Sequence, residues 1–500
     1  MDRGCGIYMP ILKLQSNYGF GSFSKETYDF IDFLSEHNIK YWQIDELSIK
    51  ESSSDKSSLS AFALDPIYLD IEKLLVSEEI EFFALDKCND YDDYKVKKSE
   101  LLRYVFDKLY YSTNIDKFIS DNEYWVYDYA VYLALKEELG VTYEKFPLHY
   151  KNLDSKETIS FIKSHSEEII YHIFLQYLTI KQWKEVKKYA NSKGVKIISK
   201  ISEMCSNDSS DLYSKPKYFK FDSILNGSNL TLNDIVFAKD NNQGEDVSLE
   251  NDSEYENSLL AYNMEAMKKD RYEWWIERLG FISKIYDFMI IENNVYEFSY
   301  KNDENQTEKY RVEKFSPFNL DMLVWIKNNA IKNIILDNVG NNLDREEYLK
   351  SKINYPYIVS LNEIYSSDSD NSESAKDKIN IIGELNKNTM LYFNRDFVSL
   401  KSCLKNESFK ENLCYHLNLN YSDYNDESSN DNILKIALEN MLSSNANLCI
   451  VSMKDIMSFE DDLQVSKNKT EDKEEANVQL NYQSEKYFEY LKQLVASKNR

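Results

Sequence analysis

The segment that most constrains the fold is a short apolar run that ends at an acid. Residues 288–291 read Phe-Met-Ile-Ile, and Glu292 follows them directly. The preceding residues 270–285 carry apolar side chains at intervals of three and four, which predicts an amphipathic helix. A helix, a turn, a buried strand and an acid at the end of the strand form the unit by which a parallel barrel presents a catalytic group.

Short apolar runs of this kind recur along the chain, and helical patterns separate most of them. Eight runs are predicted strands, and they cover residues 5–12, 39–44, 195–201, 288–291, 333–336, 353–359, 389–393 and 446–451. Parallel strands that alternate with helices in this number close naturally into a barrel. The sequence therefore predicts an α/β fold, a single (β/α)8 TIM barrel over residues 1–500.

Two long segments do not fit this alternation, and we interpret them as insertions. Residues from about 75 to 190 keep a helical periodicity for too long to be a barrel loop, which predicts a helical insertion within the barrel. Residues from about 226 to 258 are rich in Asn, Asp and Glu, which predicts a long acidic loop insertion.

The composition argues against several classes of partner. The net charge of −25 repels a phosphate backbone, so nucleic acid is not an expected partner. No window approaches the ~18 consecutive apolar residues of a membrane span, and the N-terminus lacks the pattern of a signal peptide. The six cysteines are scattered and form no Cys-x-x-Cys pair, which is typical of reduced thiols in a cytoplasmic protein.

The sequence also offers little to a metal ion. His165 and His172 could share one face of a helix, but no carboxylate at ligand spacing completes a site beside them. We therefore expect no metal and no cofactor. The oligomeric state is left open by the sequence.

Several stretches, taken in order, resemble one family, the 4-alpha-glucanotransferases (amylomaltase or disproportionating enzyme). Residues 274–279 read Trp-Trp-Ile-Glu-Arg-Leu, which matches a helix of that family outright. The other matching stretches are residues 41–44 (Tyr-Trp-Gln-Ile), 60–63 (Ser-Ala-Phe-Ala), 128–130 (Asp-Tyr-Ala), 174–177 (Phe-Leu-Gln-Tyr) and 208–213 (Asp-Ser-Ser-Asp-Leu-Tyr). The resemblance runs over nearly the whole chain, and it implies a barrel of the α-amylase type with helical insertions.

The resemblance also implies a chemistry, the retaining transfer of α-1,4-glucan segments. In such a double displacement one carboxylate attacks the anomeric carbon, and a second carboxyl protonates the leaving oxygen. A third carboxylate stabilises the cationic transition state. α-1,4-Glucans or maltodextrins are therefore the expected partners.

Carboxyl groups remain at all three positions that the resemblance assigns to catalysis. Glu292 occupies the nucleophile position, where the family has aspartate, and Asp337 occupies the acid/base position, where the family has glutamate. Asp396 keeps the stabiliser position. The support for the nucleophile differs, because Ile290 stands where the family has an arginine that orients it.

Four further residues are candidate substrate contacts. Asn293 and Arg395 stand where the family has histidines, and Lys200 stands where it has a carboxylate after the third strand. Ser54 lies in the polar loop of residues 51–60, near the position of a sugar-binding loop of the family.

These departures predict weak or lost transfer activity, since a misplacement of about 1 Å in a catalytic group can cost ~100-fold in rate. An alternative is a non-catalytic relative that binds glucan or another protein. A third interpretation is a shifted specificity, in which Lys200 and Arg395 favour an anionic sugar.

Overall fold

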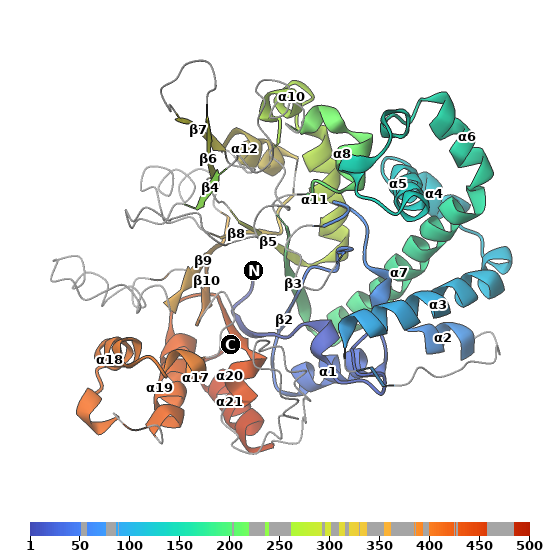
Figure 1. Cartoon of the computed structure of the whole chain (residues 1–500). Coiled ribbons are helices and arrows are strands. Elements are labelled where there is room, and N and C mark those ends of the chain that lie inside the picture. Colours follow the sequence, from blue (N-terminus) through green and yellow to red (C-terminus); the bar gives the residue numbers. More distant parts are fainter. Residues whose placement is uncertain are drawn as a thin grey trace.

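The structure is a computed structural model of the whole chain (Figure 1). It describes residues 1–51, 58–76, 87–88, 90–202, 205–219, 236–239, 262–292, 296–301, 310–315, 320–329, 331–337, 355–361, 385, 387–393, 400–424, 426, 429–457 and 485–500.

Eight parallel strands close into a barrel, in the order β1-β11-β10-β9-β8-β5-β3-β2. These strands are β1 (Gly4–Tyr8), β2 (Tyr41–Ile44), β3 (Lys196–Lys200), β5 (Phe288–Glu292), β8 (Ile334–Asp337), β9 (Tyr357–Ser360), β10 (Thr389–Tyr392) and β11 (Leu448–Ser452). They are the eight predicted strands, and the (β/α)8 TIM barrel is confirmed. The first strand is shorter than predicted, because Pro10 leads into a short 3-10 helix at Ile11–Lys13.

Side chains alternate along the barrel strands between two apolar cores. One set fills the interior of the barrel and consists of Tyr41, Ile198, Ile290, Ile335, Met390, Tyr392, Leu448 and Ile450. The intervening residues, such as Trp42, Ile291 and Leu336, pack outward into the larger core that the helices cover. Apart from β9, of which residues 357–359 are partly buried, the strands are largely buried on both faces, which explains why they appear in the sequence as continuous apolar runs.

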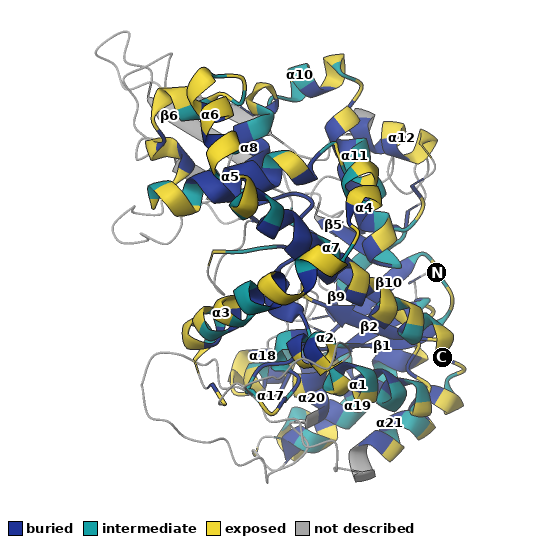
Figure 2. Ribbon diagram, turned by 90° about the vertical axis from the view of Figure 1, so that its right-hand side faces the viewer, coloured by how far each residue is buried: buried dark blue, intermediate teal, exposed yellow. Residues whose placement is uncertain are grey.

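Helices surround the barrel and cover its outer face (Figures 1 and 2). α1 (Lys25–Glu36) joins β1 to β2, α11 (Glu273–Ile285) leads into β5, and α12 (Leu320–Asn328) leads into β8. In the described part of the chain, the other α-helices outside the β2–β3 connection are α8 (Ser210–Ser214), α10 (Met264–Lys269), α17 (Leu400–Cys403), α18 (Glu407–His416), α19 (Asn430–Ser443), α20 (Met453–Met457) and α21 (Glu485–Ser497).

The connection between β2 and β3 is long and helical in its described part. It contains α2 (Ile71–Val76), α3 (Tyr91–Leu109), α4 (Asp116–Asp121), α5 (Val126–Leu139), α6 (Lys156–Ser164) and α7 (Ser166–Ser192). α5 packs on α7, which then runs directly into β3. Figure 1 shows these helices gathered on one side of the barrel.

A second, small sheet was not predicted. Its three antiparallel strands are β4 (Val236–Lys239), β6 (Tyr296–Lys301) and β7 (Tyr310–Phe315), in the order β4-β6-β7. β4 lies inside the segment of residues 226–258 that is predicted to be an acidic loop insertion; the rest of that segment lies outside the described part of the chain, so the insertion stays a prediction.

The predicted helix of residues 270–285 also begins later than expected. Arg271 and Tyr272 have φ angles of 55° and 57°, in the left-handed region, so the chain turns there between α10 and α11. None of the helices that the structure describes is both long enough and apolar enough to cross a lipid bilayer.

Candidate active site

Polar side chains line the carboxyl end of the barrel interior, which we call the barrel mouth. Lys200 lies two residues beyond Ile198 of the interior core, Asp337 lies two beyond Ile335, and Gln43 lies two beyond Tyr41. Because side chains alternate along a strand, each of these polar residues belongs to the interior face. This end of a TIM barrel is where active sites are built.

Asp337, at the predicted acid/base position, is the last residue of β8 and its side chain is 3% exposed. A carboxylate buried to this degree needs a partner, because removing the charge from water is costly. Nζ of Lys200 lies 3.7 Å from Oδ2 of Asp337 and supplies an opposite charge. The ion pair uses Asp337 as a carboxylate, whereas a general acid must carry a proton.

The ion pair crosses a strand that belongs to neither residue. Lys200 ends β3 and Asp337 ends β8, while β5 lies between these strands in the barrel. In the register of the sheet, Lys200 is opposite Ile290, and Asp337 is opposite Glu292. The backbone of Glu292 is thus placed beside that of Asp337.

Ile290 stands where the resemblance assigns the arginine that orients the nucleophile. It is 1% exposed and belongs to the interior core, together with Ile198, Ile335 and Tyr392. An apolar side chain therefore fills this place, and it cannot donate a hydrogen bond to a neighbouring carboxylate.

The structure does not reach every predicted site residue. Ser54, Asn293, Arg395 and Asp396 lie outside the described residues, and Glu292 is described through its backbone alone. Lys200 and Asp337 are the predicted site residues whose side chains the structure brings together. The pairing of Arg395 with Asp396 or Glu292, which would close a vacated site, stays a prediction.

Two tyrosines at the mouth were not singled out from the sequence. The hydroxyl of Tyr392 donates to Oε1 of Gln43 at 2.5 Å, and the hydroxyl of Tyr8 donates to Oδ1 of Asp45 at 2.7 Å. Burial raises the pKa of Tyr392 well above its usual value, and the nearby Asp337 raises it further. The sequence signal for Tyr392 was its position, one residue before the end of the predicted strand 389–393. Tyr8 lies in the middle of the predicted strand 5–12 and reaches the mouth because β1 ends there.

The described part of the chain holds no group of three or more histidine, cysteine or acidic side chains that could bind a metal ion. Nε2 of His172 instead lies 3.2 Å from Oε2 of Glu137, and both residues belong to helices of the β2–β3 connection. All six cysteines are free thiols, and five of them are buried.

Comparisons with known proteins agree with this geometry. A sequence profile described as 4-alpha-glucanotransferase matches residues 9–483. The chain is 28% identical over 301 residues to a 4-alpha-glucanotransferase of Aquifex aeolicus, covering 58% of this chain and 59% of the relative. It is 31% identical over 308 residues to a 4-alpha-glucanotransferase of Clostridium butyricum, covering 57% and 59%. The matches thus span less than two thirds of the length of these relatives.

Solved structures support the same fold. The chain superimposes on an amylomaltase from Streptococcus agalactiae in complex with acarbose with a TM-score of 0.78 and 22% identity, covering 100% of this chain and 99% of that one. An amylomaltase from Corynebacterium glutamicum gives a TM-score of 0.59 at 12% identity, covering 91% and 68%. The profile match covers most of the residues, so this chain belongs to the 4-alpha-glucanotransferase family, glycoside hydrolase family 77.

Proposed function

We propose that this protein binds α-1,4-glucans at the barrel mouth and that its transfer of glucan segments is weak or absent. Family membership supplies the substrate class. The amylomaltase of Streptococcus agalactiae was solved with acarbose bound, which supports a site for this kind of ligand on this fold.

The observation that carries the proposal is the ion pair between Lys200 and Asp337. Retaining transfer needs a carboxyl group that can reach the leaving oxygen and give it a proton. The side chain of Asp337 is 3% exposed and lies against an ammonium group, while the side chain of Lys200 is 41% exposed. In this pair, the ammonium group of Lys200 is therefore accessible from the barrel mouth, and the carboxylate of Asp337 is not.

The replacement at Ile290 points in the same direction. A positive charge beside a carboxylate favours its ionised form and fixes its orientation. Ile290 is packed in the barrel interior and provides neither effect. The side chains at Glu292 and Asp337 also differ in length from those of the family. Together these changes predict that the nucleophile and the acid/base of a double displacement are both weakened.

The ion pair also weakens the interpretation that the barrel mouth prefers an anionic sugar as its ligand. Asp337 offsets the positive charge of Lys200, so this lysine alone gives no clear preference for an anion. A neutral glucan is therefore the better-supported ligand. The remaining alternative is a non-catalytic protein whose mouth binds a glucan or another protein.

Two measurements test the proposal. Titration calorimetry with maltoheptaose should give a binding heat, and no heat at millimolar sugar would remove glucan binding. Incubation with maltotriose should then give little or no glucose and few longer maltodextrins. Rapid formation of both products would show that the catalytic machinery is intact.

A further inference from the structure

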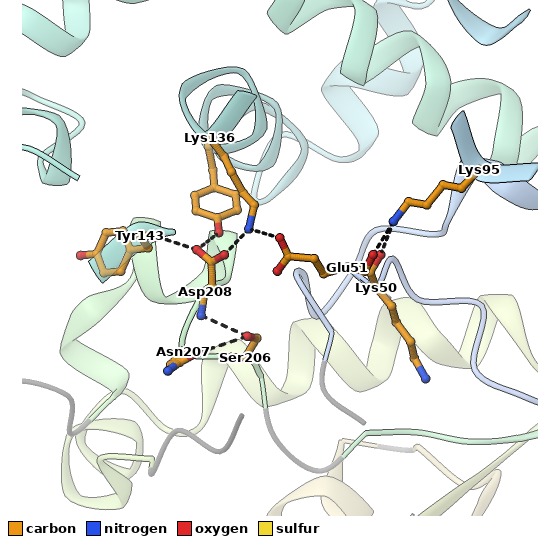
Figure 3. A network of polar contacts seen from close by, with 9 residues as sticks. Lys50, Glu51, Lys95, Lys136, Tyr143, Ser206, Asn207 and Asp208 are labelled. Carbon is orange, nitrogen blue, oxygen red and sulfur yellow. Dashed lines mark hydrogen bonds and ion pairs between the residues drawn. The ribbon is translucent and has the colours of Figure 1, made fainter. Parts of the chain in front are cut away.

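Two lysines of the helical insertion contact the segment that follows β2 (Figure 3). Nζ of Lys95, on α3, donates to the carbonyl oxygens of Lys50 and Glu51 at 3.1 and 2.7 Å. Nζ of Lys136, on α5, lies 3.1 Å from the carboxylate of Glu51. Backbone and side chain of one short segment are thus held by two separate helices.

Lys136 is itself fixed from the other side. Its ammonium forms an ion pair with Asp208, whose side chain is 8% exposed. Oδ1 of Asp208 also accepts from the hydroxyl of Tyr132 and from the backbone N–H of Tyr143, both at 2.6 Å. A buried carboxylate with three donors is a rigid partner, so the position of the Lys136 ammonium is well defined.

The held segment leads from the barrel mouth. Asp45, directly after β2, accepts from Tyr8 at the end of β1, and Glu46 accepts from the backbone N–H and the hydroxyl of Ser202 at 3.0 and 2.5 Å. Residues 45–51 are therefore tied to the mouth at one end and to the insertion at the other. Between these ends the segment pairs with residues 59–65, where the N–H of Ile49 donates to the carbonyl of Ala63 and the N–H of Asp65 donates to the carbonyl of Leu47. The segment thus connects the insertion with the mouth.

We propose that Lys95 and Lys136 are positioning residues, which attach residues 45–51 to the helical insertion and so set the β2 side of the barrel mouth for a glucan. We call these two contacts the lysine clamp. The glucan part of this inference rests on the proposed function. The clamp itself rests on the contacts between the described residues and can be tested without a ligand.

The test uses variants that leave Asp208 paired, because removing Lys136 would strand a buried charge and threaten folding. Lys95→Met removes the backbone contacts, and Glu51→Gln removes the charge that Lys136 holds, on a side chain that is 57% exposed. Lys117→Met is the matched control, since it removes an exposed lysine pair with Asp121 within the same insertion.

Hydrogen exchange of the backbone amides in residues 46–51 decides whether the clamp exists. Lys95→Met and Glu51→Gln should speed this exchange by about three- to tenfold, the factor that corresponds to losing one ordinary hydrogen bond, while Lys117→Met leaves it unchanged. Equal exchange in wild type and both clamp variants would overturn the clamp.

Calorimetry with maltoheptaose then tests the positioning. Both clamp variants should bind maltoheptaose about three- to tenfold more weakly than wild type does. The conservative variant Lys95→Arg should bind as wild type does, because arginine keeps a donor for the same carbonyl oxygens. Faster exchange with unchanged affinity would overturn the positioning role. If wild type itself gives no heat, the proposed function fails, and with it the glucan part of the inference, while exchange still decides the clamp.

Discussion

Lys200 and Asp337 form an ion pair across the end of a strand that lies between their own strands. The distance from Nζ to Oδ2 is 3.7 Å, and β5, which ends at Glu292, separates β3 from β8. This contact joins the predicted acid/base position to a lysine that stands where the family has a carboxylate. It is the structural observation behind the proposed loss of activity.

The pair makes a measurable contribution to stability. Lys200→Gln should lower the free energy of unfolding by about 1 kcal/mol, because it leaves the buried carboxylate of Asp337 without this cation, while the exposure of Lys200 limits the effect. Urea unfolding measures the change. Lys196→Gln, at the exposed start of the same strand, is the control and should change stability by less than about 0.5 kcal/mol. Equal effects of the two variants would contradict this role.

Ile290 is packed in the barrel interior, so we expect that the arginine which the resemblance assigns to this position does not fit there. Ile290→Arg should lower the free energy of unfolding by about 3 kcal/mol or more, because it inserts a charge among Ile198, Ile335 and Tyr392. Ile290→Leu keeps the volume and should cost less than about 1.5 kcal/mol. An arginine variant as stable as wild type would show that the site still accommodates the original side chain.

The buried Lys98 should make the free energy of unfolding rise at alkaline pH. It donates to the carbonyl of Leu69 at 2.6 Å and to the hydroxyl of Tyr94 at 3.1 Å, and burial lowers its pKa from 10.5 to about 8. Between these values the unfolded chain binds the proton that the folded chain has lost. Stability should therefore rise with pH from about 8 to 10.5, with a slope of up to about 1.4 kcal/mol per unit.

Urea unfolding at pH 8 and pH 9.5 compares wild type with Lys98→Met. The methionine variant should lack the added rise, and Lys97→Met, one residue earlier on the same helix and with a partly exposed side chain, should keep it. Parallel pH profiles for wild type and Lys98→Met would refute the assignment.

The buried Asp455 should have the opposite effect, making the free energy of unfolding fall as the pH rises from acidic values. It lies in α20, beyond the end of β11, and its Oδ1 accepts from the backbone N–H of Leu400 at 2.5 Å. Burial raises the pKa of Asp455 from 3.8 to about 7, although that hydrogen bond and Lys454 partly oppose the rise. The folded chain holds the proton more tightly, so this contribution is complete below about pH 4 and is lost as the pH rises through about 7.

Asp455→Asn keeps an oxygen for the N–H of Leu400 and removes the titration. Its stability should fall less than that of wild type between pH 5 and pH 7.5, as measured by thermal or urea unfolding. A wild-type profile that coincides with that of the asparagine variant would rule out a raised pKa.

The barrel was predictable because its strands are largely buried on both faces. Continuous apolar runs such as residues 288–291 and 446–451 are typical of parallel strands, and all eight were found. The small sheet was missed although residues 296–301 and 310–313 alternate apolar and polar side chains, the pattern of an antiparallel strand. β4 gave a weaker signal, because Val236–Lys239 is short and lies in a strongly polar segment.

The candidate site was predictable in its positions and not in its contacts. Glu292 and Asp337 directly follow predicted strands, whereas Lys200 lies within one, and the resemblance to the family singled out all three as site residues. The ion pair depends on strand order and register, which place β5 between β3 and β8 and set Glu292 opposite Asp337. Neither quantity is encoded in a local pattern, since both result from closing the barrel.

The rate of glucan transfer from maltotriose tests the central claim most directly. The purified protein is compared with the 4-alpha-glucanotransferase of Clostridium butyricum at equal concentration, and release of glucose is followed with time. The ion pair of Asp337 with Lys200 and the apolar Ile290 predict a rate at least about 100-fold lower than that of the relative. A rate within about tenfold of the relative would contradict the account, because it would require an acid/base and a nucleophile in working order.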